Sequence, residues 1–205
     1  MNYKTVDHRD SFELEVKKSI FIGNIAPVTH EDEAIAFVNE IRKTYPDARH
    51  NVYAYLLREN SAMRYSDDRE PQGSAGMPVL DVIRKNGITD VVVTVTRYFG
   101  GILLGMGGLV RAYTDAAAGA VAAAVPVEII HSAVARITCS YSDYQKILPL
   151  LEISGGKVLD TAFDVNVTIT VTFPYEDISS VCVKLRDETS GRASIERLPS
   201  EYKKW

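Results

Sequence analysis

The chain has 205 residues, of which 23 are Lys or Arg and 27 are Asp or Glu, and its formal net charge is −4 at pH 7. This acidic balance argues against nucleic-acid binding that relies on positive charge over the whole surface. Only a local basic face could bind nucleic acid. The sequence has no apolar run of the roughly 18 residues that a membrane span needs, no apolar signal core and only two cysteines. We therefore expect a cytoplasmic protein without a membrane partner, built as one large or two small domains.

The first half of the sequence alternates between strand and helix patterns. Residues 1–18 are polar and are expected to form a loose arm or an edge strand, and Ser19–Val28 has the β-formers of a strand. A helix with apolar positions three and four residues apart follows and ends at Pro46. Three further strands and one short helix are predicted next, in the order strand Asn51–Leu57, strand Met63–Ser66, helix Val79–Lys85 and central strand Asp90–Thr96.

A glycine-rich segment follows the last of these strands and leads into an alanine-rich helix that ends at Pro126. Its five glycines are Gly100, Gly101, Gly105, Gly107 and Gly108. So many glycines indicate backbone at positive φ, or backbone that approaches another group closely. We expect Gly107 or Gly108, at the start of the helix, to need either a positive φ or a close approach to another group.

The same segment carries two arginines, and it has two interpretations. Backbone amides at a helix N-terminus favour phosphate, and Arg97 and Arg111 could contact the same anion, since Arg111 lies one helical turn past Gly107 and Gly108. The other interpretation is a tight strand–helix connection whose glycines are steric. The spacing fits neither GxxxxGK[ST] nor GxGxxG, so no nucleotide-binding fingerprint is predicted.

A polar loop, DDREPQGSAGMP, occupies residues 67–78 and precedes the short helix. Its acids Asp67, Asp68 and Glu70 could hold Mg²⁺ through carboxylate oxygens, or could be solvated or cap local amides. His50 could act as a general base, but no Ser or Cys nucleophile motif accompanies it, and a hydrogen-bonded histidine at a strand start is the favoured interpretation. We predict no metal and no cofactor.

Three aromatic residues accompany the glycines, and they could be stacking platforms or core. Tyr98, Phe99 and Tyr113 could stack on bases, as aromatic residues do in single-strand and RNA sites. Because neighbouring side chains of a strand point to opposite faces, at most one of Tyr98 and Phe99 is expected beside a ligand.

The second half of the sequence has a different pattern. Strict alternation of apolar residues with Asn and Thr between Val165 and Phe173 predicts a half-buried antiparallel strand. The full predicted order is strand Ser132–Tyr141, helix Ser142–Ile153, strand Lys157–Phe163, strand Val165–Phe173, helix Glu176–Thr189 and strand Arg192–Leu198. This βαββαβ order is typical of a ferredoxin-like module. We expect an α+β protein with domains at 1–130 and 131–205.

The central motifs resemble those of the YigZ/IMPACT family. The family loop, close to DDGEPxGTAGxP, matches from Asp67 to Pro78, and its motif RYFGGxxLGxGGLVxAY matches from Arg97 to Tyr113. The sequence DARH at residues 47–50 is also similar to the family. Arg69 replaces the usual Gly and Ser74 the usual Thr, so a side chain is tolerated at the first position and a hydroxyl is kept at the second.

The resemblance implies a fold and a broad role. It implies an N-terminal α/β domain similar to domain IV of elongation factor G, and a C-terminal ferredoxin-like domain similar to its domain V. It implies no settled reaction, although eukaryotic relatives regulate translation through a protein partner. Our interpretation is that this protein binds RNA, the ribosome or a translation-related protein and acts in translation regulation. The phosphate contacts would then come from Arg97, Arg111 and the five glycines. The residues expected at the other wall of the site are His50, Asp67, Asp68, Glu70, Ser74, Tyr98 and Tyr113.

Two other classes of function stay open at this point. One is an enzyme that acts on a small phosphorylated substrate, with His50 and the acidic cluster as acid–base or metal groups. The other is a protein–protein adaptor without a polar site. A basic face across both domains would favour RNA binding, whereas a closed pocket that joins His50, Asp68 and Arg97 would favour the enzyme. An exposed apolar patch would favour the adaptor.

Overall fold

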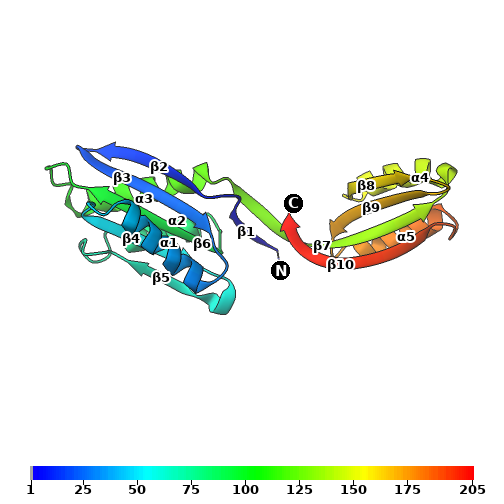
Figure 1. The fold of residues 1–205 in the computed structure, drawn as a ribbon, viewed down its shortest axis with the longest axis horizontal. Helices are drawn as coiled ribbons and strands as arrows, with labels where there is room; N and C mark the ends of the chain where they lie inside the picture. The colour runs from blue at the N-terminus through cyan, green and yellow to red at the C-terminus, as the bar shows by residue number, and fades with distance from the viewer. Residues whose placement is uncertain (1) are drawn as a thin grey trace. The chain divides into compact units, whose positions relative to one another are not determined.

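The computed structural model describes residues 2–205, which form two compact units of mixed α+β structure (Figure 1). We call residues 3–128 the N-terminal domain, and residues 129–205 together with Asn2 the C-terminal domain. Within this described part of the chain, no helix is long and apolar enough to cross a membrane.

The N-terminal domain is built on a five-stranded antiparallel sheet with the order β2-β3-β6-β4-β5. The strands are β2 (Asp10–Val16), β3 (Ser19–Pro27), β6 (Val91–Tyr98), β4 (His50–Leu56) and β5 (Met63–Ser66). The run of β-branched residues in β6 therefore occupies the centre of the sheet, as predicted. A 3₁₀ turn at Glu59–Ser61 joins β4 to β5. β1 (Tyr3–Val6) forms an isolated bridge from Lys4 to Ile88 and also neighbours β7 (Pro126–Cys139) in the order of the second sheet.

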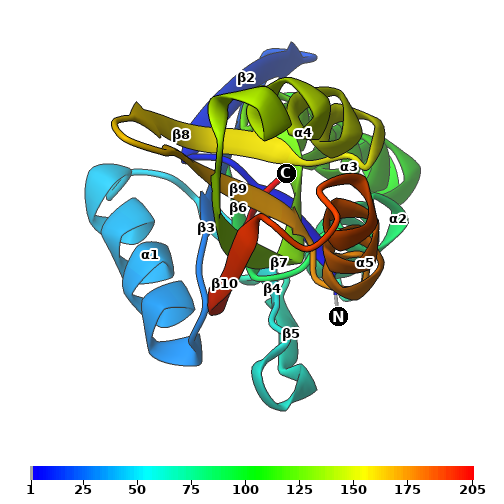
Figure 2. The same cartoon turned by 90° about the vertical axis from the view of Figure 1, so that its right-hand side faces the viewer.

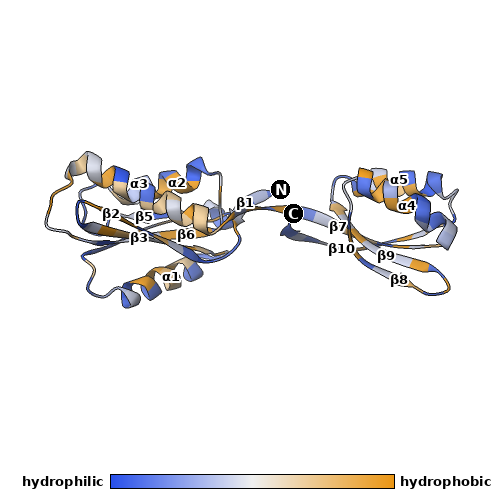
Figure 3. Cartoon of the chain, turned by 90° about the horizontal axis from the view of Figure 1, so that it is seen from above, coloured by the Kyte–Doolittle hydropathy of each residue, from blue (hydrophilic) through white to orange (hydrophobic). Residues whose placement is uncertain are grey.

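Helices cover both faces of this sheet (Figures 2 and 3). On one face α2 (Gly76–Lys85) and α3 (Gly105–Ala123) pack over Val91, Val93 and Val95. On the other face α1 (Glu31–Thr44) packs over Val92. Successive residues of β6 are thus buried on opposite sides, which explains why Val91, Val92 and Val93 follow one another without a polar residue between them.

The alanines of α3 allow the helix to lie close to the sheet. A Cβ atom added at Gly23 of β3 would stand 2.4 Å from the carbonyl oxygen of Ala116, and Ala120 is its other near neighbour. A larger side chain at any of these positions would push the helix away. The alanine-rich composition is therefore a packing requirement as well as a source of helix propensity.

The C-terminal domain has the predicted βαββαβ order. Its elements are β7 (Pro126–Cys139), α4 (Tyr141–Ile153), β8 (Lys157–Phe163), β9 (Val167–Pro174), α5 (Ile178–Glu188) and β10 (Ser194–Lys204). The antiparallel strands follow the order β10-β7-β9-β8, and both helices cover one face (Figure 3). The apolar residues of β9 are buried beneath these helices, as its alternation predicts.

The structure changes two details of this domain. β7 begins at Pro126 and β10 extends to Lys204, so both strands are longer than predicted. Because β7 runs continuously through residues 126–139, the predicted division at 130/131 falls inside a strand. The limits 1–130 and 131–205 stay predictions.

The expectation of a positive φ at Gly107 or Gly108 is wrong, because α3 already begins at Gly105 and neither residue has one. A Cβ atom at Gly107 would meet nothing within 4 Å, whereas one at Gly108 would stand 3.1 Å from Cβ of Leu104. The positions that require glycine lie earlier in the segment. Gly101 and Gly105 have φ values of +83° and +70°, and a Cβ atom at Gly100 would stand 2.0 Å from the carbonyl carbon of Lys18.

We therefore predict opposite effects for alanine at two of these glycines. Gly100→Ala should lower the free energy of unfolding by about 1–3 kcal/mol, because the backbone of Lys18 leaves no room for a methyl group. Gly107→Ala should leave stability unchanged or raise it by about 0.5–1 kcal/mol, since alanine favours a helix over glycine. Urea unfolding of both variants measures this, and equal effects would contradict the assignment.

The C-terminal domain should also fold by itself. A fragment of residues 126–205 contains β7 to β10 and both helices, and should unfold cooperatively on heating, because these elements form their own buried core. A fragment of residues 140–205 is the matched control, since it lacks β7, the strand between β10 and β9. A disordered longer fragment would contradict the independence of this domain.

Candidate functional site

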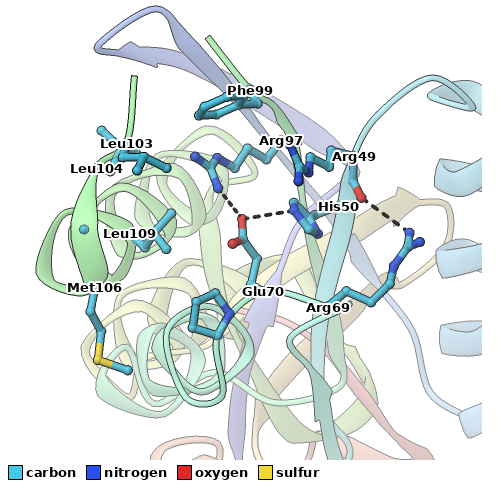
Figure 4. Close-up of a pocket in the computed structure, with 12 residues that line it drawn as sticks. Arg49, His50, Arg69, Glu70, Arg97, Phe99, Leu103, Leu104, Met106 and Leu109 are labelled. Carbon is cyan, nitrogen blue, oxygen red and sulfur yellow. Dashed lines mark hydrogen bonds and ion pairs between the residues drawn. The ribbon is translucent and has the colours of Figure 1, made fainter. Parts of the chain in front are cut away.

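A cavity of about 450 Å³ lies in the N-terminal domain, where β4, β6, the polar loop and the start of α3 meet (Figure 4). It is lined by Arg49, His50, Arg69, Glu70, Pro71, Arg97, Phe99, Leu103, Leu104, Gly105, Met106 and Leu109. Volumes of this size are typical of small-molecule sites.

The sheet register brings His50 and Arg97 together. His50 begins β4 and lies directly opposite Arg97 of β6, while Phe21 of β3 lies opposite Arg97 on its other side. Directly opposed residues of neighbouring strands project from the same face. That face is the one that carries Val93 and Val95, so both polar side chains extend the core side of the sheet.

Asp67 shapes the polar loop from within. Its carboxylate accepts hydrogen bonds from the backbone N–H groups of Gly73 at 2.9 Å, Ala75 at 3.1 Å and Gly76 at 2.7 Å. These amides precede α2 or begin it, where N–H groups have no partner inside the helix. Asp67 therefore caps the start of α2 and does not line the cavity.

Glu70 is the acid that reaches the cavity. Its Oε1 accepts a hydrogen bond from Nη1 of Arg97 at 2.6 Å and another from the hydroxyl of Tyr113 at 2.9 Å. Nε2 of His50 lies 3.7 Å from the same oxygen. Burial, reinforced by the charge of Glu70, raises the pKa of Tyr113, so Tyr113 stays a phenol that donates.

The tautomer of His50 follows from its second contact. Nδ1 lies 2.7 Å from the backbone carbonyl oxygen of Asp68. A carbonyl oxygen can only accept, so Nδ1 carries a proton. In neutral His50 the lone pair is then on Nε2, the atom that faces Glu70. Asp68 is itself held by the backbone N–H of Asn51, which donates to its carboxylate at 2.6 Å.

Arg97 is buried and is held between aromatic rings. Its Cζ lies 5.5 Å from the ring centroid of Phe21 and 5.6 Å from that of Phe99. Its Nε is buried and has no hydrogen-bond partner among residues 2–205. Arg49 and Arg69 are exposed at the mouth, and Arg69 donates to the carbonyl oxygen of Arg49 at 3.4 Å.

The charge of the cavity is positive in a protein that is acidic overall. Three guanidinium groups line it, and Glu70 is the one acid among the lining residues that the structure describes. No protein side chain within residues 2–205 caps the N-terminus of α3, and Gly105 at that terminus also lines the cavity. The helix dipole therefore adds to the positive potential.

The structure brings together only part of the predicted site. His50, Glu70, Arg97 and Gly105 line the cavity, and Tyr113 supports Glu70 from the core. The predicted residues outside the lining are Gly100, Gly101, Gly107, Gly108, Arg111, Asp67, Asp68, Ser74 and Tyr98.

The separation of these residues has local causes. Arg111 lies on α3 directly before Ala112 and Tyr113, which face the core, and its own side chain is exposed to solvent. The hydroxyl of buried Ser74 donates to the carbonyl oxygen of Pro71 at 2.6 Å. Phe99 lines the cavity and Tyr98 does not, in agreement with the alternation argument.

Arg49 and Arg69 line the cavity but were not predicted as site residues. Arg49 directly precedes His50, and Arg69 lies between two acids of the loop motif, so their proximity to predicted site residues was the available signal. A magnesium site is not formed by the loop acids, because each points to a different partner. Among residues 2–205 there is no group of three His, Cys, Asp or Glu side chains that could hold a metal.

Two family models match this chain. Residues 17–121 match the Impact N-terminal domain, and residues 137–192 match a domain of unknown function, DUF1949. The first range contains all residues that line the cavity.

Two relatives are similar over different shares of this chain. IMPACT family member YigZ of Escherichia coli K12 is 33% identical over 184 residues, which cover 88% of this chain and 90% of the relative. IMPACT family member YvyE of Bacillus subtilis 168 is 44% identical over 113 residues, or 55% of this chain and 52% of that protein. A solved structure described as the crystal structure of an hypothetical protein has a TM-score of 0.61 and 30% identity, over 98% of each chain.

The buried ion pair gives a stability prediction. Arg97→Ala should lower the free energy of unfolding by about 3–5 kcal/mol, because Glu70 would stay buried without its cation. Adding Glu70→Gln should recover part of this loss. Arg136→Ala is the control, since its pair with Glu196 is exposed and should contribute about 0–1 kcal/mol. Chemical denaturation that finds equal losses for Arg97→Ala and Arg136→Ala would contradict the prediction.

Proposed function

The chain belongs to the IMPACT family, and we propose that its N-terminal domain binds a small phosphorylated compound in the cavity between β4, β6 and α3. The observation that carries this proposal is the convergence of three guanidinium groups on one cavity of about 450 Å³. Arginine is well suited to the task, because its planar fork of N–H donors matches the geometry of phosphate oxygens.

The three arginines have different parts in this proposal. Arg97 is rigid, because Glu70 and two aromatic rings hold it before a ligand arrives, and this lowers the entropy lost on binding. Arg49 and Arg69 stand at the mouth and can close on an anion from the solvent side. The uncapped start of α3 offers backbone N–H groups to the same anion.

A bound phosphate would lie near a proton acceptor. Nε2 of His50 is the ring nitrogen that faces the cavity, and its lone pair is available when the ring is neutral. In the enzyme interpretation, His50 and Glu70 are therefore the candidates for the acid–base groups. Asp67 and Asp68 are not assigned an acid–base role, since both lie outside the cavity lining, backbone amides hold both carboxylates and Asp68 also pairs with Arg69.

A second candidate is the RNA- or ribosome-associated role in translation regulation that the family resemblance implies. The observation that favours it is Phe99, which is 39% exposed and has the guanidinium groups of both Arg49 and Arg97 5.6 Å from its ring centroid. Such a ring can stack on a terminal base while the arginines hold its phosphate.

Calorimetric titration with inorganic phosphate and simple phosphomonoesters tests the first candidate. Arg49→Ala and Arg69→Ala should each weaken binding by about tenfold or more, since a hydrogen bond to a charged group contributes about 1.5–3 kcal/mol. Arg111→Ala is the matched control, because this exposed arginine lies on α3 outside the cavity. Absence of binding at millimolar ligand, or equal losses in all three variants, would contradict the proposal.

The same variants also test the RNA candidate, through the salt dependence of binding. Titration with single-stranded RNA at several salt concentrations should give a log–log slope of about −0.7 per phosphate contact, and the two cavity variants should flatten it. If phosphomonoesters displace the RNA, both ligands share the cavity. If RNA binds and phosphomonoesters do not, the small-molecule proposal is wrong.

A further inference from the structure

We infer that the ligand of this cavity is an amphiphilic anion, a phosphate monoester whose organic part is an aliphatic chain and not a sugar. This inference rests on the proposed function, because it assumes that the basic side of the cavity holds a phosphate. It adds the chemical class of the remainder of the ligand.

The cavity is divided into a charged side and an apolar side (Figure 4). The charged side comes from β4, β6 and the polar loop and contains His50, Glu70 and the three arginines. The apolar side comes from the segment after β6 and the first turns of α3. Its side chains are Phe99, Leu103, Leu104, Met106 and Leu109.

The apolar side has nothing to recognise a hydroxylated ligand. None of these five side chains carries a hydrogen-bond donor, and Met106 offers only a weak thioether acceptor. Hydroxyl groups of a sugar placed there would lose their water without gaining partners. Each such unpaired group weakens binding by about tenfold or more, so a sugar phosphate is disfavoured at this side.

An aliphatic chain would gain binding free energy at this apolar side, where a sugar would lose it. Leu103 is 81% exposed and Met106 is 59% exposed, beside the cavity that they line. A chain that covers them removes apolar surface of both partners from water. One buried methylene contributes about 0.8 kcal/mol, which is about fourfold in affinity. Affinity should therefore rise steadily with chain length until the apolar side is filled.

The depth of the basic groups favours a separate ligand over a membrane surface. The side chains of Arg97, Glu70 and His50 are 7%, 5% and 9% exposed, so a phosphate that meets them must enter the cavity. A headgroup that stays in the plane of a bilayer could reach only the exposed Arg49 and Arg69. The occupant is therefore a single molecule whose phosphate enters first.

A chain-length series tests the inference in the full-length protein. Butyl, hexyl and octyl phosphate, each below its micelle concentration, are titrated beside inorganic phosphate, ribose 5-phosphate and octanol. Affinity should increase about fourfold per methylene. Ribose 5-phosphate should bind no tighter than inorganic phosphate, and octanol, which lacks the anion, should bind weakly.

Variants separate the apolar side from the phosphate site. Leu103→Ser and Met106→Ser should remove much of the gain with chain length and leave the affinity for inorganic phosphate unchanged. Ile153→Ser is the matched control, because this side chain is 86% exposed in the C-terminal domain and lies outside the cavity. It should leave the whole series as in the unmodified protein.

The outcomes distinguish this inference from the proposed function. If all phosphate monoesters bind with one affinity whatever their chain, the inference is wrong and the phosphate site stands. If no phosphate compound binds, both are wrong. Tighter binding of ribose 5-phosphate than of butyl phosphate would also overturn the inference, as would binding to phosphatidic acid vesicles without binding to any soluble alkyl phosphate.

Discussion

The buried carboxylate of Glu70 is the constraint on which the candidate site depends. One oxygen of this side chain accepts hydrogen bonds from Arg97 of β6 and Tyr113 of α3, and lies 3.7 Å from His50 of β4. An ionised carboxylate away from water is tolerated only with such partners. The polar loop, two strands and a helix therefore meet at one atom, and the cavity opens beside it.

The same network explains how an acidic protein can present a basic cavity. Glu70 offsets the charge of one arginine, and two more arginines remain at the mouth. The other loop acids oppose them less, because Asp67 is turned towards the amides of α2, and Asp68 accepts from the amide of Asn51 with one oxygen while the other lies 4.0 Å from Nε of Arg69. Net charge of the chain thus says little about the potential at this site.

The fold was predictable from the sequence because its signals are local. Alternation in β9, β-branched residues in β6 and alanines in α3 each indicate an element and the face that it buries. The errors concern lengths and starts, such as the start of α3 at Gly105, which moved the requirement for glycine from Gly107 to Gly100. That requirement arises from the backbone of Lys18, more than 80 residues away in the chain.

The candidate site was predictable only in part. The sequence by itself determined the two-domain α+β order and the residue types of the site, since motifs and periodicity are properties of neighbouring residues. Only the tertiary structure decided that His50 lies opposite Arg97, that Glu70 accepts from Tyr113, and that Arg111 faces solvent. The physical reason is that strand register and helix rotation are set by packing between distant segments, and a shift of one residue would exchange a lining side chain for a buried or an exposed one.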